Sequence, residues 1–357
     1  MYTRSMENLP PVTVIMPVRN EAAYIERSLG AVLAQDYPSD CLEILVVDGL
    51  SADGTREYVR AQQAAHPRLR LLDNPAGIVP PGLNIGIAQA TGDIIVRVDG
   101  HCEIAPDYVR QCVRHLLEDD VEAVGGPIET IGETDEAQAI ALAMSSWFGV
   151  GGSAFRTVKD RPLLVETVAF PAYARQTLQR LGPFDEEMVR NQDDEYNYRL
   201  SKGGGRILLS PDVRSRYYSR GTLRSLWRQY YQYGFWKVRV MQKHPRQMRA
   251  RQFAPPAFVA ALLGSAAVGL VWRPFRWLLG LIVALYALAD VAASLSLGRA
   301  HGREYIPRLL IIHPILHLSY GWGFLVGLAR AGFRFVAALA GRAGNRDSKP
   351  SINHHVR

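Results

Sequence analysis

Three acidic side chains in the first hundred residues, Glu21, Asp48 and Asp99, each follow an apolar, β-branched run. Carboxylates that meet at one place repel one another unless a cation or hydrogen-bond donors join them. Mg²⁺ and Mn²⁺ prefer carboxylate oxygens and bridge substrate phosphates, and the chain has no glycine-rich phosphate loop. Each aspartate taken singly reads as a turn former. Three together indicate a site for a divalent cation and a phosphate-bearing ligand.

A second acidic group stands later in the chain, in the segment Asn191–Leu200. Asp193, Asp194 and Glu195 fall at the start of a predicted helix, where the helix dipole favours carboxylates. Three consecutive residues cannot all cap one helix end, so at least one is expected to face a cavity or a cation. Upstream of this group, Ala139–Gly152 predicts a single apolar helix.

The elements that position these residues alternate between strand and helix patterns. The predicted strands are Val12–Val18, Glu43–Gly49, Leu69–Asp73, Asp93–Gly100 and Val121–Pro127. The predicted helices between them are Glu21–Gln35, Ser51–Ala65, Pro81–Ala90 and Pro106–Leu117. This alternation predicts an α/β fold with a mostly parallel sheet covered by helices on both faces. Ligands of such sheets bind outside the carboxyl ends of the strands, so the acidic residues should converge there.

Length and composition limit the class of protein. The chain has 357 residues, room for two or three domains, and its three cysteines lack metal-type spacing. Residues 237–357 hold 17 Lys and Arg against 3 Asp and Glu, whereas residues 1–236 hold 24 against 31. The acidic N-terminal part argues against nucleic acid as a partner. The cysteines exclude a disulfide scaffold and favour a reducing compartment.

Long apolar runs share the basic C-terminal part. Ala254–Trp272 carries no charge, Trp277–Leu297 carries only Asp290, and Leu309–Ala329 is a weaker third run. About 20 apolar residues span a bilayer, so two or three membrane spans are expected; buried core helices are the alternative. A third full span would place the basic tail outside, against the positive-inside rule. Either that rule fails here or one segment is re-entrant. We expect a catalytic domain over residues 1–245, a membrane domain over 254–335 and a disordered basic tail over 336–357.

Residues 12–245 resemble the inverting family 2 glycosyltransferases of the GT-A fold. PVTVIMPVRNEAAYIERSLGAVLAQ resembles the family's first strand and helix, VVDGLSADGT its nucleotide-binding turn, and RVDGH the position of its D-x-D motif. LGPFDE and NQDDEYNYRL resemble its acceptor loop and its base motif. QYYQYGFWKVR, followed by apolar spans, is most similar to a subgroup that assembles succinoglycan exopolysaccharide.

The resemblance implies roles for individual residues. The residues implied to bind the donor are Pro17, Asn20, Glu21, Asp48 and Asp99. The residues implied to bind a divalent cation, Mg²⁺ or Mn²⁺, are Asp99 and His101. The catalytic base is Asp193, with Asp194 as its competitor. The acceptor or phosphate side is Glu195, Gln232 and Trp236. The chain departs from the family at three positions. His101 stands at the second aspartate of D-x-D, Gln192 stands where the base motif has Glu, and Phe235 stands where Q-x-x-R-W has Arg.

The implied function is transfer of a sugar from a nucleotide-diphospho-sugar, a UDP-hexose, to a lipid-linked oligosaccharide in exopolysaccharide or other cell-surface glycan synthesis. The expected place is the inner (plasma) membrane, with several spans and a cytoplasmic catalytic domain. Alternatives are a processive polysaccharide synthase, disfavoured by the eroded Q-x-x-R-W, and a non-catalytic membrane scaffold. A sugar-nucleotide pyrophosphorylase would need a basic, Gly-rich loop after the first strand, which VRNEAAYI lacks.

Overall fold

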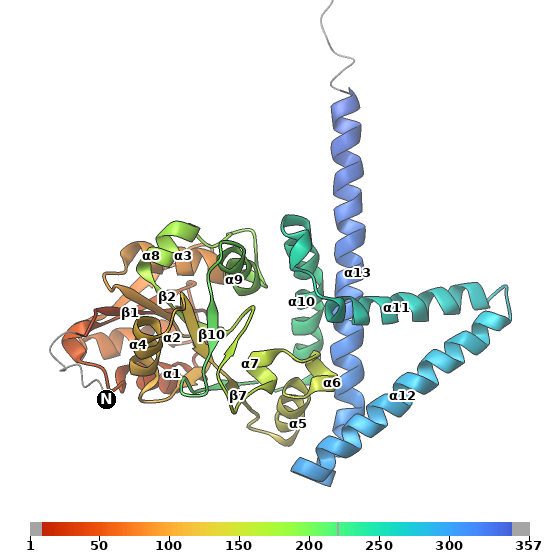
Figure 1. Cartoon of the computed structure of the whole chain (residues 1–357), viewed down its shortest axis with the longest axis horizontal. Coiled ribbons are helices and arrows are strands. Elements are labelled where there is room, and N and C mark those ends of the chain that lie inside the picture. Colours follow the sequence, from red (N-terminus) through yellow and green to blue (C-terminus); the bar gives the residue numbers. More distant parts are fainter. Residues whose placement is uncertain (1–8, 220, 345–357) are drawn as a thin grey trace, which may run out of the picture.

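The computed structural model describes residues 9–219 and 221–344, with side chains up to residue 333. Its centre is an eight-stranded sheet in the order β3-β2-β1-β4-β9-β6-β10-β8 (Figure 1). The first half holds β1 (Val12–Val18), β2 (Leu42–Asp48), β3 (Leu69–Asp73) and β4 (Ile94–Arg97). These four strands pair in parallel, as the alternating pattern predicts.

The parallel half is stable because its strands are apolar on both faces. Every residue of β1 and of β2 is buried, in register from Val12 opposite Leu42 to Val18 opposite Asp48. The connecting helices are α1 (Ile25–Leu33), α2 (Thr55–Gln63), α3 (Val79–Gln89) and α4 (Tyr108–Glu118), with a 3₁₀ turn η2 (Ser39–Cys41) before β2. Each predicted helix is confirmed with ends shifted by up to four residues.

The second half of the sheet is mixed rather than parallel. Its strands are β6 (Ala123–Gly126), β8 (Leu163–Leu164), β9 (Ala169–Ala174) and β10 (Ile207–Leu209). β9 lies antiparallel between β4 and β6, and β8 is antiparallel to β10. A separate small sheet contains β5 (Cys102–Ile104), β7 (Ile128–Ile131) and β11 (Ser215–Tyr218). The predicted strand Asp93–Gly100 therefore ends at Arg97, and the chain turns into β5.

Short helices accompany these strands in the chain. They are α5 (Asp135–Met144), α6 (Trp147–Val150), α7 (Ala154–Thr157), α8 (Arg175–Leu181) and α9 (Gln192–Lys202). The prediction of one helix over Ala139–Gly152 is wrong, because Ser146 starts α6 as a new helix. Its hydroxyl accepts a hydrogen bond from the Gly149 N–H at 3.0 Å, as an N-cap does. The predicted helix start at the acidic triplet is confirmed in α9.

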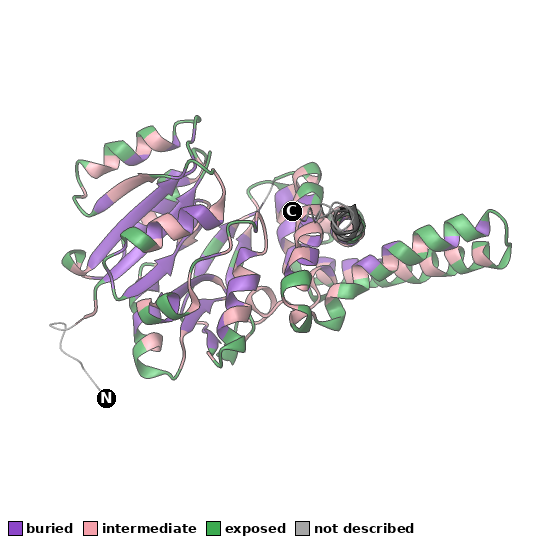
Figure 2. Cartoon of the chain, turned by 90° about the horizontal axis from the view of Figure 1, so that it is seen from above, coloured by how far each residue is buried: buried purple, intermediate pink, exposed green. Residues whose placement is uncertain are grey.

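Four long helices make up the C-terminal part: α10 (Leu223–Lys243), α11 (Ala250–Gly269), α12 (Pro274–His301) and α13 (Ile306–Gly344), with 3₁₀ turns η3 (Pro245–Gln247) and η4 (Arg303–Tyr305). In Figure 1, α10 lies alongside α13, while α11 and α12 form a hairpin that projects away from the eight-stranded sheet. Figure 2 shows the sheet buried and this hairpin largely exposed.

By length and composition, three helices among the described residues are apolar enough to cross a membrane: Ala250–Gly269, Pro274–His301 and Arg303–Phe333. They contain the second and third predicted apolar runs, and the first run as far as Gly269. α13 continues to Gly344 and so overlaps residues 336–344 of the predicted tail. The rest of the predicted tail lies outside the described residues.

Candidate functional site

One large cavity of about 1270 Å³ begins at the carboxyl ends of β1 and β4 and ends among α10, α11, α12 and α13. At the sheet end it is lined by Pro17, Glu21 and Asp99, and at the far end by apolar side chains such as Phe258 and Leu316. The cavity therefore joins the predicted chemical centre to the apolar helices.

Glu21 and His101 meet at the sheet end of the cavity. His101 Nδ1 lies 2.9 Å from Glu21 Oε1, and both side chains are mostly enclosed. The chain reaches this point through the turn that follows β4, where the Cys102 N–H donates to the Asp99 carbonyl oxygen at 3.0 Å. Pro17, Glu21, Asp99 and His101 thus line one wall, as predicted for donor and metal residues.

Asp48 and Asn20 lie outside the cavity lining. The Asp48 carboxylate is fully buried and accepts hydrogen bonds from the Ser51 N–H at 2.9 Å, from the Ser51 hydroxyl at 2.5 Å and from Arg56 at 2.6 Å. Asn20 Oδ1 accepts from the Ala52 N–H at 3.0 Å. Asp48 thus orders the turn after β2, and Asn20 ties that turn to the turn after β1. Direct contact of Asp48 with a nucleobase stays a prediction.

Asp193 and Asp99 share one cation, Arg97. Arg97 is the last residue of β4; its Nε donates to Asp99 Oδ1 at 2.8 Å, and its Nη1 pairs with the Asp193 carboxylate. Burial alone would lower the pKa of Arg97, but the attraction of Asp193 and Asp99 raises it. The predicted base and the predicted metal ligand are therefore coupled through a permanently charged side chain.

Burial from water raises the pKa of Asp193 above its ordinary value, although Arg97 acts in the opposite direction. About a third of the side chain, 34%, stays accessible, and this residue lines the cavity. A carboxylate with a raised pKa that reaches solvent through a cavity has the properties of a general base.

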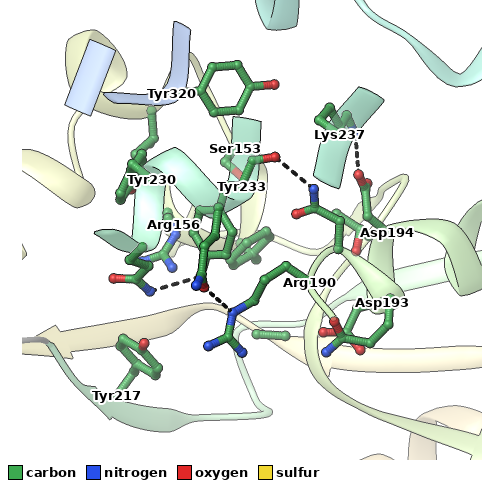
Figure 3. A pocket seen from close by; sticks show the side chains of 18 of the residues that line it. Ser153, Arg156, Arg190, Asp193, Asp194, Tyr217, Tyr230, Tyr233, Lys237 and Tyr320 are labelled. Atoms are coloured by element: carbon green, nitrogen blue, oxygen red, sulfur yellow. Dashed lines mark hydrogen bonds and ion pairs between the residues drawn. The ribbon is translucent and has the colours of Figure 1, made fainter. Parts of the chain in front are cut away.

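Asp194 is directed elsewhere. Its carboxylate pairs with Lys237 of α10, whose side chain is only 5% accessible. Figure 3 shows Asp194 turned toward Lys237 and Asp193 turned away from it. Successive residues of a helix point about 100° apart, so only one of the two faces Arg97. The structure thus places Asp193, and not Asp194, beside Asp99.

The predicted acceptor-side residues are divided. Gln232 lines the cavity, and its Oε1 accepts a hydrogen bond from Arg190 Nε at 3.1 Å. Glu195 is buried behind the wall, where its carboxylate meets Arg199 at 3.0 Å and His244 at 2.9 Å. Trp236 packs beside Phe235 outside the lining. Glu195 and Trp236 therefore support the wall rather than form its surface.

Several residues of the cavity escape prediction from sequence. Arg97 is one, although an arginine inside an apolar strand is itself an unusual signal. Asn74 is another: it directly follows β3, a strand end that the sequence argument leaves out. Its side chain is 3% exposed and lines the cavity, and its Oδ1 has no hydrogen-bond partner among the described residues.

The middle of the cavity carries three further cations, Arg156, Arg190 and Arg228. None has a carboxylate partner in the part of the chain that the structure describes. The Arg156 guanidinium lies 5.8 Å from the centre of the Tyr217 ring, and Gln232 orients Arg190. Figure 3 shows Arg156 and Arg190 among the side chains that line the cavity. Uncompensated guanidinium groups in a cavity are suited to phosphate.

The donor set for a metal is small. Over residues 9–219 and 221–344, no three His, Cys, Asp or Glu side chains form a metal-binding group. Asp99 and His101 supply one carboxylate and one imidazole on the cavity wall. These ligands fit a divalent cation whose remaining positions are filled by substrate phosphate oxygens and water, as is usual for Mg²⁺.

Residues 13–182 match the family model described as Glycosyl transferase family 2. A solved structure, the mannosyltransferase PcManGT from Pyrobaculum calidifontis in complex with GDP-Man and Mn²⁺, is similar with a TM-score of 0.56 and 25% identity, covering 86% of this chain and 88% of that one. Residues 13–182 therefore form a family 2 glycosyltransferase domain on a GT-A fold, and the chain is a glycosyltransferase.

Similarity to individual proteins extends over the C-terminal helices as well. The succinoglycan biosynthesis protein ExoA of Rhizobium meliloti (strain 1021) is 29% identical over 320 residues, 87% of this chain and 93% of that protein. A Methanococcus voltae dolichyl N-acetyl-alpha-D-glucosaminyl phosphate 3-beta-D-2,3-diacetamido-2,3-dideoxy-beta-D-glucuronosyltransferase is 25% identical over 332 residues, 91% of this chain and 99% of that protein. The chain thus belongs with enzymes of polysaccharide and glycan biosynthesis.

Proposed function

We propose that the chain transfers a hexose, with inversion, from a nucleotide-diphospho-sugar such as a UDP-hexose to a lipid-linked oligosaccharide, in the assembly of exopolysaccharide or another cell-surface glycan. The observation that carries this proposal is the single cavity, which holds Asp99 and Asp193 at one end and apolar side chains of the C-terminal helices at the other. The proposed site of action is the cytoplasmic face of the inner membrane.

The donor occupies the sheet end. Pro17 and Glu21 line the nucleoside pocket, and the unpartnered Oδ1 of Asn74 accepts a hydrogen bond from a ring N–H of the base. A buried acceptor without a partner costs about 1–3 kcal/mol, so a ligand that donates to it gains affinity and specificity. Asp48 contributes by holding the Ser51 turn in place.

Asp99 and His101 would hold the divalent cation. When bound, it neutralises charge on the leaving diphosphate as a Lewis acid. Arg97 keeps the Asp99 carboxylate oriented, through bonds of 2.8 Å and 3.2 Å to its two oxygens.

Asp193 takes the proton of the attacking hydroxyl group at its Oδ atom. The acceptor oxygen bonds to the anomeric carbon from the face opposite the diphosphate, the carbon–oxygen bond to the diphosphate breaks, and the nucleoside diphosphate leaves with that electron pair. One displacement inverts the anomeric configuration, so no second carboxylate nucleophile is required. Base catalysis of this kind is worth about 10²–10⁴ in rate.

The acceptor enters from the membrane end. Arg156 and Arg190, which lack carboxylate partners in the described chain, are placed to bind the phosphates that join lipid and glycan. Phe258 of α11, Tyr286 of α12 and Leu316 of α13 offer an apolar path for the first isoprene units. The name of the Methanococcus relative describes a dolichyl phosphate-linked substrate, which supports this class of acceptor.

The test is a transfer assay in membranes that contain the full chain. A panel of radiolabelled nucleotide sugars, UDP-glucose first, is combined with polyprenyl diphosphate-linked glycans and Mn²⁺ or Mg²⁺. We expect one donor to label a lipid-extractable product, with Asp193→Asn as the inactive control. Absence of transfer from every donor overturns the proposal, and equal transfer to a lipid-free glycan overturns its acceptor part.

A further inference from the structure

The third apolar run is covered along one face by the catalytic part of the protein. Leu309, Ile312 and Leu316 of α13 are buried in one cluster with Ile140 of α5 and Leu226 of α10. Further along α13, the Arg330 guanidinium lies 5.9 Å from the centre of a ring of α10. The run Leu309–Ala329 is therefore packed against α5 and α10 from end to end.

Glycines make this packing close. A Cβ atom placed on Gly323 would lie 2.0 Å from the carbonyl oxygen of Tyr231, and one on Gly234 would lie 2.0 Å from that of Tyr320. α10 holds five Lys and Arg residues, and its Gln229, Tyr230 and Lys237 line the catalytic cavity. If α13 crossed the bilayer, α10 with its charges would have to enter the hydrocarbon, where a central charge costs about 2.5–3.5 kcal/mol or more.

The α11–α12 hairpin has the opposite character. Its contacts with α13 lie at its base: Val259 meets Gly321, Tyr286 bonds to His317 at 2.8 Å, and Asp290 bonds to His313 at 2.7 Å. Asp290 is the one acidic residue of the hairpin helices, and it is buried there. In the most apolar stretches of α11 and α12, only 22% and 11% of residues are buried, against 44% in α13.

We propose that α11 and α12 cross the bilayer as a hairpin with the apex outside, while α13 lies along the cytoplasmic membrane surface, held by α10. This rests on the cytoplasmic catalytic domain of the proposed function. The arms beyond the base, 260–272 and 273–285, have 13 residues each, about 20 Å at 1.5 Å per residue. A surface helix is embedded by about 5–10 Å, and together these lengths approach the ~30 Å hydrocarbon core.

The outer surface of α13 suits an interfacial position. Ile311, Trp322 and Phe333 are exposed and recur every eleven residues, about three turns, so they share one face. That face is separate from the one that packs on α10. Trp is enriched at membrane interfaces, and the apex of the hairpin also carries exposed Trp272 and Trp277.

The charges support the same topology. Of the 17 Lys and Arg in residues 237–357, only Arg273 and Arg276 lie at the apex, and the other 15 remain on the cytoplasmic side. Three spans would instead place 8 outside and 9 inside, because the six that follow residue 329 would cross. The positive-inside rule therefore favours two spans.

The test maps both ends of the topology on the full chain. In a Cys41→Ser background, where Cys102 and Cys112 stay buried, Val271→Cys probes the apex and Asp160→Cys probes an exposed catalytic loop. A membrane-impermeant maleimide should label Val271→Cys in intact spheroplasts and Asp160→Cys only after permeabilisation. A C-terminal green fluorescent protein should fluoresce, and a C-terminal alkaline phosphatase should be inactive.

Active phosphatase at the C-terminus would show three spans and overturn the proposal. Protection of Val271→Cys until permeabilisation, with a fluorescent C-terminus, would show a hairpin that does not cross and would overturn it too. Labelling of Asp160→Cys in intact spheroplasts would overturn the cytoplasmic orientation itself. Sugar transfer is measured on the same membranes: its absence with the expected labelling counts against the proposed function, and leaves the topology standing.

Discussion

Replacement of Asp193 by Asn tests the proposed catalytic base directly. The amide keeps the size of the carboxylate and an oxygen that can accept from Arg97, but it cannot take a proton. We expect kcat to fall by about 10²-fold or more with little change in donor binding. Arg97 retains its bonds to Asp99 at 2.8 Å and 3.2 Å, so the wall of the cavity should stay in place.

The same substitution should not destabilise the fold at neutral pH. The folded-state pKa of Asp193 is raised, so its contribution to stability is present below the unfolded-state pKa and is lost as the pH rises through the folded-state value. Above that pH the carboxylate is ionised in the folded protein, and its burial lowers the free energy of unfolding. A neutral isostere removes this penalty, and the melting temperature of Asp193→Asn should equal or exceed that of the parent.

Asp194→Asn is the matched comparison, and it should behave in the opposite way. The substitution removes the carboxylate partner of Lys237, whose side chain is only 5% accessible. The Asp194 side chain is 27% accessible. Loss of one partner of a buried pair costs about 3–5 kcal/mol, and the partial accessibility of Asp194 places this pair near 3 kcal/mol. The double variant Asp194→Asn/Lys237→Met removes both charges and should recover most of that stability.

The assay combines single-turnover sugar transfer with thermal unfolding in detergent for the three variants. The expected pattern is a stable but inactive Asp193→Asn and an unstable Asp194→Asn whose activity returns with the double change. A stable, inactive double variant beside an active Asp193→Asn would refute the reasoning and make Asp194 the base.

Three further outcomes are expected. Arg97→Gln removes the charge that lowers the pKa of Asp193, so the acid limb of the kcat/KM profile should move to higher pH. Arg97→Lys keeps the charge and should leave the acid limb near its original position. The pH profiles of both variants check this. Chelation should abolish transfer and Mn²⁺ or Mg²⁺ restore it, and Asp99→Asn should need at least about tenfold more metal, since even changes around the ligands cost 10–100-fold in metal affinity; metal titrations measure it. Gly323→Ala should destabilise the packing of α13 by about 1–3 kcal/mol and reduce transfer, whereas Gly332→Ala, with open space around its Cβ, should do neither; melting curves and transfer rates compare the two.

The sequence predicts the parallel half of the sheet because its strands alternate with helices. β1, β2 and β3 pair in chain order, and β4 crosses back to pair with β1. The mixed half does not follow from such local patterns. β9 inserts between β4 and β6, although residues 98–122 and 127–168 separate these strands in sequence. Which distant strand fills that place depends on packing across the whole sheet. The break at Ser146 was missed because its cap lies inside an apolar run, where periodicity alone favours one helix.

The sequence predicts the position of a site residue well where its side chain directly follows a strand. It predicts the position less well where hydrogen-bond partners determine which way the side chain points. Pro17, Glu21 and Asp99 line the cavity as expected, because the carboxyl ends of parallel strands share an edge. Asp48 occupies an equivalent position but is turned inward by Ser51 and Arg56, residues whose contacts no motif specifies. Residue type and spacing thus located the edge, and tertiary contacts decided which carboxylates face the substrate.

α10 is the element that links chemistry to the apolar helices. One of its faces lines the cavity with Gln232 and Lys237, and the other receives Gly323 of α13 at close range. The buried hydrogen bond between Asp290 and His313, at the base of the hairpin, fixes α12 to the same α13. We expect a shift of the hairpin to reach, through α13 and α10, the wall that orients Asp194, one residue from the proposed base. Because interiors are closely packed, such a shift cannot be absorbed locally, and the geometry of Asp193 should depend on whether the hairpin is held.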